Sequence, residues 1–241
     1  MWTREALKSR AKDVLRGNYW TAFVVSLVLV FVSSDGGSGS SNAGTNYSTN
    51  NSDTLIRFLP IILVVVLIFL ALSIFVFYNL EVGGRRFFVR AAEGKSDIGY
   101  LGSAFSDGQY LPIIGTMFLK DIFILLWTLL LIIPGIVKSY AYRFVPYILA
   151  DNPEIGASRA IELSNEMTRG HKWSMFVLDL SFIGWYLLGL LALGIGVLFV
   201  KPYENATMAE LYLVLRKNSL DDGSTSYREL NMETPEVVVE A

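Results

Sequence analysis

Residues 111–172 read LPIIGTMFLKDIFILLWTLLLIIPGIVKSYAYRFVPYILADNPEIGASRAIELSNEMTRGHK, and this stretch decides the fold. It holds an apolar run long enough to cross a bilayer, a Pro-Gly pair that favours a chain break, a second and more polar run, and an amphipathic helix. This order predicts a membrane hairpin that leads into a helix at the water surface. The composition agrees, because 53% of the 241 residues are hydrophobic and only 17% are charged, against about 25% charged residues in soluble domains.

Apolar runs recur along the chain, and they predict an all-α, polytopic transmembrane helix bundle of about six spans. The clearest run carries no charge from residue 58 to residue 80, which is long enough for a transmembrane helix. The run at 136–150 is short and rich in polar and aromatic residues, so it fits either a crossing or a re-entrant helix. The six predicted spans cover residues 19–33, 57–80, 111–133, 136–150, 173–193 and 197–215.

The basic residues lie mainly on one side of these spans. Fifteen of the 20 Lys and Arg residues fall in the two tails and the even-numbered loops. The positive-inside rule therefore places both termini in the cytoplasm of a cell membrane protein. Removing the span at 136–150 alone would move a basic loop to the opposite side. One of the predicted cytoplasmic loops is a basic extension of the second span, with Arg85, Arg86, Arg90 and Lys95.

We expect residues 1–217 to form a single membrane domain with three segments outside the lipid core. Residues 1–17 predict a basic amphipathic helix in the headgroup layer, although a basic region before an apolar run also fits a signal peptide. Residues 34–56 are rich in Gly, Ser and Asn and predict a flexible extracytoplasmic loop. Residues 152–170 predict a cytoplasmic amphipathic helix, and residues 218–241 a disordered acidic tail.

Charged residues inside the predicted spans are the candidate functional groups, because a charge in lipid is costly and commonly faces protein or a wet cavity. Lys120 and Asp121 are neighbours and would face different sides of one helix, unless the span begins near Phe123 and both lie at the water interface. The candidate intramembrane polar core consists of Lys138, Arg143, Asp179, Lys201 and Glu204.

Side chains for common catalytic chemistry are scarce. The chain has no cysteine and one histidine, His171, so disulfides, thiolate metal sites and cysteine nucleophiles are excluded. No set of nucleophile and base can be assembled, and no basic footprint indicates nucleic acid. We therefore expect no catalytic residues, no cofactor and no metal. The expected partner is the lipid bilayer, with another membrane protein or a second copy of the chain as further candidates.

Three stretches carry a resemblance to a known family: MWTREALKSRAKDVLRGNYW at 1–20, PGIVKSYAYRFVPYILADNPEIGASRAIELSNEMTRGHKW at 134–173, and FVLDLSFIGWYLLGLLALGIGVLFVKPYENATMAELYLVLR at 176–216. They resemble the bacterial integral membrane protein family called domain of unknown function 975. The resemblance implies a multi-span membrane protein without an assigned reaction, and it offers no catalytic residues to carry over.

Three classes of function remain open. A non-enzymatic membrane accessory, immunity or envelope-stress factor is our first hypothesis, because it fits the missing catalytic set. A small-solute transporter or channel is the alternative and would use the candidate polar core, although the chain shows no convincing internal repeat of the kind that transporters often have. A membrane-embedded enzyme that acts on lipid has the least support.

Overall fold

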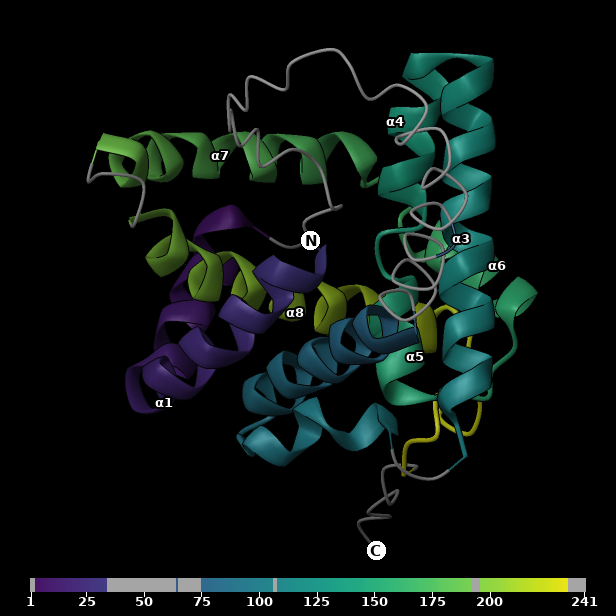
Figure 1. Ribbon diagram of the computed structural model, residues 1–241, viewed down its shortest axis with the longest axis horizontal. Coiled ribbons are helices and arrows are strands. Elements are labelled where there is room, and N and C mark those ends of the chain that lie inside the picture. The colour runs from purple at the N-terminus through teal and green to yellow at the C-terminus, as the bar shows by residue number, and fades with distance from the viewer. Residues whose placement is uncertain (1–2, 34–63, 65–74, 106–107, 192–195, 234–241) are drawn as a thin grey trace, which may run out of the picture.

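The computed structural model describes residues 3–33, 64, 75–105, 108–191 and 196–233, and their regular structure is entirely helical (Figure 1). The predicted loop 34–56 and most of the predicted span 57–80 lie outside the described residues. The helices are α1 (Arg4–Ser33), a helix over residues 75–92, the short 3-10 helices η1 (Ile98–Leu101) and η2 (Ser103–Phe105), α3 (Tyr110–Leu130), α4 (Ile132–Ala141), α5 (Val145–Asp151), α6 (Ala157–Met167), α7 (Lys172–Leu191) and α8 (Gly196–Asp221).

The last helix, α8, lies at the centre of the packing. It contacts α1 along much of its length and also meets α7 and α6. The helices α3 and α4 form a second unit side by side, and α6 packs against α3 and α5. The core residues of α8 include Ala209, Leu211, Tyr212 and Leu215, which are almost completely buried. Because α1 and α8 are the first and last helices of the described residues, their packing joins the two ends of the bundle.

The hairpin between α3 and α4 breaks earlier than the Pro-Gly pair predicts. Leu131 is extended, with φ −160° and ψ 137°, and α4 begins at the next residue. Pro134 therefore lies in the first turn of α4, where its missing N–H costs no hydrogen bond. Gly135 lets the two helices touch, because a Cβ there would lie 2.4 Å from Thr128 Oγ1 and 2.7 Å from Thr128 Cα. The Pro-Gly pair thus starts the second arm and is not itself the break.

The doubtful span at 136–150 is divided into two short helices. Since α4 has 10 residues, it is about 15 Å long, half of the ~30 Å hydrocarbon core. Every residue of α5 is buried in the protein. The turn between them is held by α6, because Ser164 Oγ donates to Ala141 O at 2.8 Å and accepts from the Phe144 N–H at 3.2 Å. This region is a broken helix whose second part, α5, is packed on protein, whereas Ile136 and Val137 of α4 are exposed.

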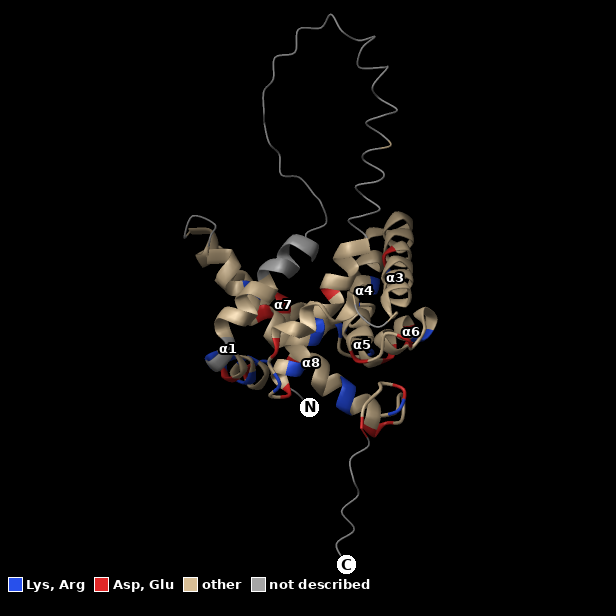
Figure 2. Cartoon of the chain, turned by 60° about the horizontal axis from the view of Figure 1, so that its bottom comes forward, with Lys and Arg blue, Asp and Glu red and all other residues tan. Residues whose placement is uncertain are grey.

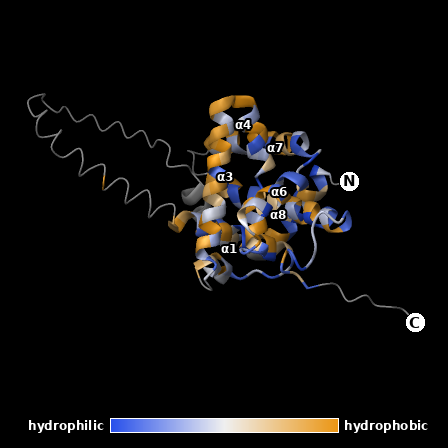
Figure 3. Ribbon diagram, turned by 90° about the vertical axis from the view of Figure 1, so that its right-hand side faces the viewer, coloured by the Kyte–Doolittle hydropathy of each residue, from blue (hydrophilic) through white to orange (hydrophobic). Residues whose placement is uncertain are grey.

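Two helices in the described part of the chain are long and apolar enough to cross a membrane, α3 and α7. Their bounds agree with the predicted spans 111–133 and 173–193. Only 17% and 22% of their most apolar windows are buried in the protein, whereas the core helix of a soluble protein is mostly buried. The described residues contain two of the six predicted spans as long apolar helices. These two helices are not parallel, because α7 runs across the direction of α3 (Figures 1 and 3).

The predicted amphipathic helix at the N-terminus is present, but protein covers its apolar face. Leu7, Ala11 and Leu15 are buried, and α1 continues to Ser33 without a break at the predicted stop. Lys8 Nζ donates to Ser181 O at 3.4 Å and lies 4.5 Å from the centre of the Phe182 ring. This helix packs on α8 and touches α7 through Lys8, while its place in the headgroup layer stays a prediction.

The helix over residues 75–92 enters the bundle instead of running into water as a basic loop. Phe87 and Phe88 are buried, and Gly83 allows η1 to approach very closely. A Cβ at Gly83 would lie 2.2 Å from Leu101 O and 3.1 Å from Tyr100 O. This helix is therefore a packed element of the core, and its arginines are held among other helices.

The predicted helix at 152–170 is shorter, because α6 begins only at Ala157 and residues 152–156 form a loop. Its predicted small-residue face is buried, with Ala160, Ile161 and Ser164 turned into the protein. Beyond α8 we expected disorder from residue 218, but through residue 233 the structure shows ordered turns. Leu230 is fully buried, and Asn152 Nδ2 donates to Glu229 O at 2.9 Å.

Candidate functional site

The first part of the candidate polar core joins the turn between α4 and α5 to α7. Arg143 Nη1 lies 2.6 Å from Asp179 Oδ2, and the Tyr140 hydroxyl donates to the same oxygen at 2.8 Å. The two charged side chains are 27% and 28% exposed. Asp179 Oδ1 is buried and has no hydrogen-bond partner among the described residues. The pair thus fastens two helical elements and leaves one acceptor unused.

The second part joins α7 to α8. Lys201 Nζ lies 2.9 Å from Glu204 Oε2, one helical turn along. The Tyr186 hydroxyl donates to the same carboxylate oxygen, and Lys201 Nζ lies 5.3 Å from the centre of the Tyr186 ring. The charge of Arg143 also acts on Glu204. The two ion pairs are therefore neighbours that share one electrostatic environment.

Lys138 is the member of the predicted core that stands apart. Its ammonium group lies 5.1 Å from the Trp127 ring and 5.5 Å from the Tyr142 ring, and no ion pair reaches it within the described residues. For Lys120 and Asp121 the sequence allowed either a place inside a span or a place at the water interface. The two side chains pair with each other at 3.1 Å, and the Tyr78 hydroxyl donates to Asp121 at 2.6 Å. The structure brings four of the five predicted core residues together in two pairs.

The sequence did not identify Arg85 as part of this interior. Its Nη1 lies 3.0 Å from Asn205 Oδ1 and 3.4 Å from the Tyr147 hydroxyl, and its Nη2 lies 3.4 Å from Glu81 Oε1. Asn205 in turn donates to Ser26 Oγ at 3.1 Å. Arg85 therefore links α1, α5 and α8 through its own helix. The i, i+4 spacing of Glu81 and Arg85 was a local signal for an ordered helix at this place.

A second cluster of charges lies where α5, α8 and residues 90–93 meet. The side chain of Asp151 is 1% exposed; it accepts from Tyr212 at 2.7 Å and from Arg216 at 2.9 Å. Arg90 lies 3.8 Å away, and Glu93 pairs with both arginines. Burial raises the pKa of Glu93, but hydrogen bonds and charge from Arg216 and Arg90 outweigh it and hold the pKa below its ordinary value. Two acids and two arginines balance, so this cluster stabilises the packing.

The C-terminal segment is fixed to α6 by Arg159. Its Nε lies 2.6 Å from Glu229 Oε1, its Nη2 donates to Ser224 O at 2.6 Å, and its Nη1 lies 3.3 Å from both Glu162 and Glu166. The hydrogen bond from Arg159 lowers the pKa of Glu229. One guanidinium group thus holds the ordered turns after α8 against the start of α6.

These arrangements pair charges and do not assemble reactive groups. In the part of the chain that the structure describes, no group of three or more His, Cys, Asp or Glu residues could hold a metal ion. His171 lies in the turn before α7 and has an interaction partner. What the central polar residues can do is join helices through charge-assisted hydrogen bonds, which are stronger than neutral ones.

The described residues define a class: an all-α fold in which two helices, α3 and α7, are long and apolar enough to cross a membrane. Within this class, residues 122–219 match the family described as "Protein of unknown function (DUF975)". The matched range begins in α3 and contains all five residues of the predicted polar core. The resemblance predicted from the sequence is thus confirmed over this range. No curated protein and no solved structure matches the chain.

Proposed function

We propose that the chain is a multi-pass integral membrane protein that acts without catalysis, as an accessory, immunity or envelope-stress factor of the cell membrane. The observation that carries the proposal is the apolar surface that the protein leaves uncovered on α3, α4 and α7. Leu129, Ile133 and Leu191 are 74%, 76% and 82% exposed, and hydrophobic residues cover the joined ends of α3 and α4 (Figure 3). Contiguous apolar surfaces of this kind mark contact with lipid or with another protein.

The charge distribution supports the same location. Many of the charged residues lie on α1, α6, α8 and the C-terminal turns (Figure 2), whereas residues 122–137 around the tip of the α3–α4 hairpin carry no charge. A hairpin with an uncharged tip can enter the hydrocarbon layer without the cost of burying a charge in lipid. That cost is about 2.5–3.5 kcal/mol or more for each Lys, Arg or Asp.

The pairing of the interior charges favours an accessory role over transport. A transport site needs charged groups that can exchange a protein partner for a solute. Here Arg143 pairs with Asp179 and Lys201 with Glu204, and a tyrosine hydroxyl further satisfies each carboxylate. Groups engaged in this way hold helices together. The factor would then act through its outer helix surfaces, on lipid, on another membrane protein or on a second copy of itself.

Site-directed labelling tests the membrane arrangement with both termini in the cytoplasm. Because the natural chain has no cysteine, each introduced thiol is the only one present. We expect a membrane-impermeant maleimide to label Ser40→Cys in intact cells and to label Asn218→Cys only after permeabilisation. Equal labelling of both variants in intact cells would contradict this topology, and extraction of the wild-type protein by carbonate without detergent would contradict membrane integration.

Transport remains the second candidate because of one atom, the unpartnered Asp179 Oδ1, which could accept a hydrogen bond from a solute. Flux assays in proteoliposomes separate the two candidates. A solute flux that is lost in Asp179→Asn and Glu204→Gln, but kept in the exposed control Glu154→Gln, would favour transport. Flux unaffected by these substitutions, together with a membrane protein that co-purifies, would favour the accessory role.

A further inference from the structure

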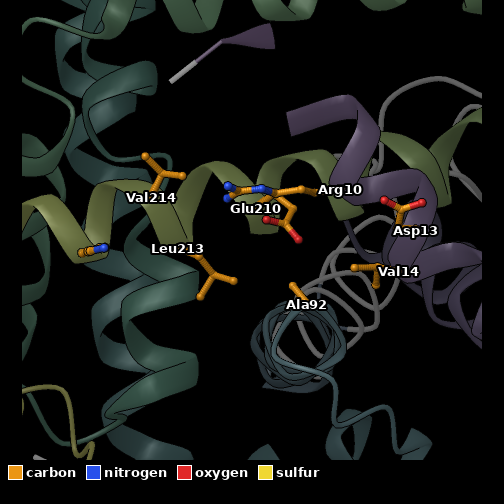
Figure 4. Close-up of a pocket in the computed structure, with 8 residues that line it drawn as sticks. Arg10, Asp13, Val14, Ala92, Glu210, Leu213 and Val214 are labelled. Atoms are coloured by element: carbon orange, nitrogen blue, oxygen red, sulfur yellow. The ribbon is translucent and has the colours of Figure 1, made fainter. Parts of the chain in front are cut away.

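A pocket of about 460 Å³ lies between α1, the helix over residues 75–92 and α8 (Figure 4), and none of the residues of the central ion pairs lines it. Its floor contains Glu210, which is only 6% exposed. Its walls are apolar, with Val14, Leu213 and Val214, and its lining also includes the exposed Arg10, Asp13 and Lys217. The pocket thus combines one buried acid, two surface cations, one surface acid and an aliphatic wall.

Glu210 is the unusual member of this group. Figure 4 shows its carboxylate pointing from α8 into the space between the three helices. Among the described residues, no hydrogen bond or ion pair reaches this carboxylate, and the charge that acts on it most is that of Arg10. The residue is largely buried, but its carboxylate faces the pocket and forms no ion pair among the described residues, so the pocket presents a negative acceptor to its open space.

The cations at the rim are also unengaged. No ion pair reaches Arg10 or Lys217 within the described residues, whereas the nearby Asp13 pairs with Arg16 at 3.4 Å. Lys217 lies two helical turns from Glu210 on α8, a rise of about 10 Å. The pocket therefore offers an acceptor for a positive group in its floor and donors for a negative group at its rim, with aliphatic side chains between them.

We infer that this pocket binds the zwitterionic head group of a phospholipid of the phosphatidylethanolamine type. Glu210 receives the ammonium group, and Arg10 and Lys217 receive the phosphate, as charge-assisted hydrogen bonds favour. The apolar wall of Leu213 and Val214 suits the start of the acyl chains and makes a lipid a better occupant than a free zwitterion. The inference rests on the membrane location proposed above, and it names the lipid that the factor contacts.

The test uses the purified full-length protein in detergent and measures the binding of three probes: a short-chain phosphatidylethanolamine, a matching phosphatidylglycerol and free phosphoethanolamine. We expect the wild type to prefer phosphatidylethanolamine over phosphatidylglycerol, which has phosphate but no ammonium group. Glu210→Gln should weaken the binding of phosphatidylethanolamine about tenfold, because one charge-assisted contact is lost. It should leave the binding of phosphatidylglycerol unchanged. The exposed control Glu154→Gln should bind both lipids as the wild type does.

A second variant covers the phosphate end. Lys217 lies on the surface, so Lys217→Gln should fold normally and weaken the binding of both lipids. Binding of phosphatidylethanolamine without free phosphoethanolamine identifies a lipid site, and binding of both identifies a head-group site that also takes free zwitterions. The inference is overturned if the wild type shows no preference between the lipids, or if Glu210→Gln keeps that preference. Either result leaves the labelling of Ser40→Cys and Asn218→Cys unaffected, so the two proposals fail separately.

Discussion

Gly83 is the position at which one substitution should have the clearest effect on folding. A Cβ there would lie 2.2 Å from Leu101 O, 2.9 Å from Leu101 C and 3.1 Å from Tyr100 O. All three are backbone atoms, so no side chain can rotate out of the way. Gly83→Ala must therefore push η1 away from the helix over residues 75–92 and disturb the packing of both.

The size of the effect follows from two opposing contributions. Forcing an extra methyl group into a packed contact costs about 1–3 kcal/mol, and the fixed backbone places Gly83→Ala near the upper end. Replacing glycine by alanine inside a helix returns about 1 kcal/mol. The net loss is about 2 kcal/mol. For a chain of this size, 1 kcal/mol shifts the melting temperature by about 2–4 °C, so we expect a decrease of about 4–8 °C.

Gly115 in α3 provides the matched control, because a Cβ there meets nothing within 4 Å. Gly115→Ala should keep only the gain in helix propensity and raise the melting temperature by about 2–4 °C. Both variants can be followed by intrinsic tryptophan fluorescence of the purified protein in detergent. A Gly83→Ala variant that melts at or above Gly115→Ala would refute the reasoning.

Three further predictions concern the ion pairs and the C-terminal segment. In a double-mutant cycle, Arg143→Gln and Asp179→Asn should show a coupling energy of about 1 kcal/mol, since both side chains are partly exposed; simple additivity would contradict the pair. Leu230→Ala truncates a fully buried side chain and should reduce the free energy of docking of the C-terminal segment by about 2–5 kcal/mol. A protease should then cleave this segment faster than in the wild type. The pKa of Glu229 is lowered, first by the hydrogen bond from Arg159. The contribution of Glu229 to docking of the segment is therefore complete above the ordinary glutamate pKa of about 4.3 and is lost as the pH falls through the lowered pKa. The sensitivity of the segment to protease should rise over that pH range in the wild type, and Glu229→Gln should lack this rise.

The features that sequence reasoning predicted are those whose signal is local. The bounds of α3 and α7 follow from unbroken apolar runs, and the structure places them close to the predicted spans. The buried face of α6 follows from a helical period of small and apolar residues, and Ala160 and Ser164 lie on it as expected. The pairing of Arg143 with Asp179 was not predicted. The cost of a charge in an apolar setting did predict that both residues would face protein or a wet cavity.

The features that were missed depend on contacts between distant segments. Arg85 was read as part of a basic loop, because its neighbours in sequence are basic, whereas its partners Tyr147 and Asn205 lie 62 and 120 residues away. The break at Leu131 depends on how closely Gly135 approaches Thr128, which a turn rule cannot foresee. The C-terminal segment is polar enough to predict disorder, and its order comes from Leu230 and a single distant arginine.

The central place of α8 has a consequence for how the protein is made. A ribosome completes α1, α5 and α7 before it produces Asn205, Glu204 and Arg216, yet those three residues are partners of Ser26, Tyr186 and Asp151. Until α8 is made, Arg85 and Asp151 carry charges that lack their partners in that helix. The contacts of α8 with α1 and α7 can therefore form only after α8 itself has been synthesised.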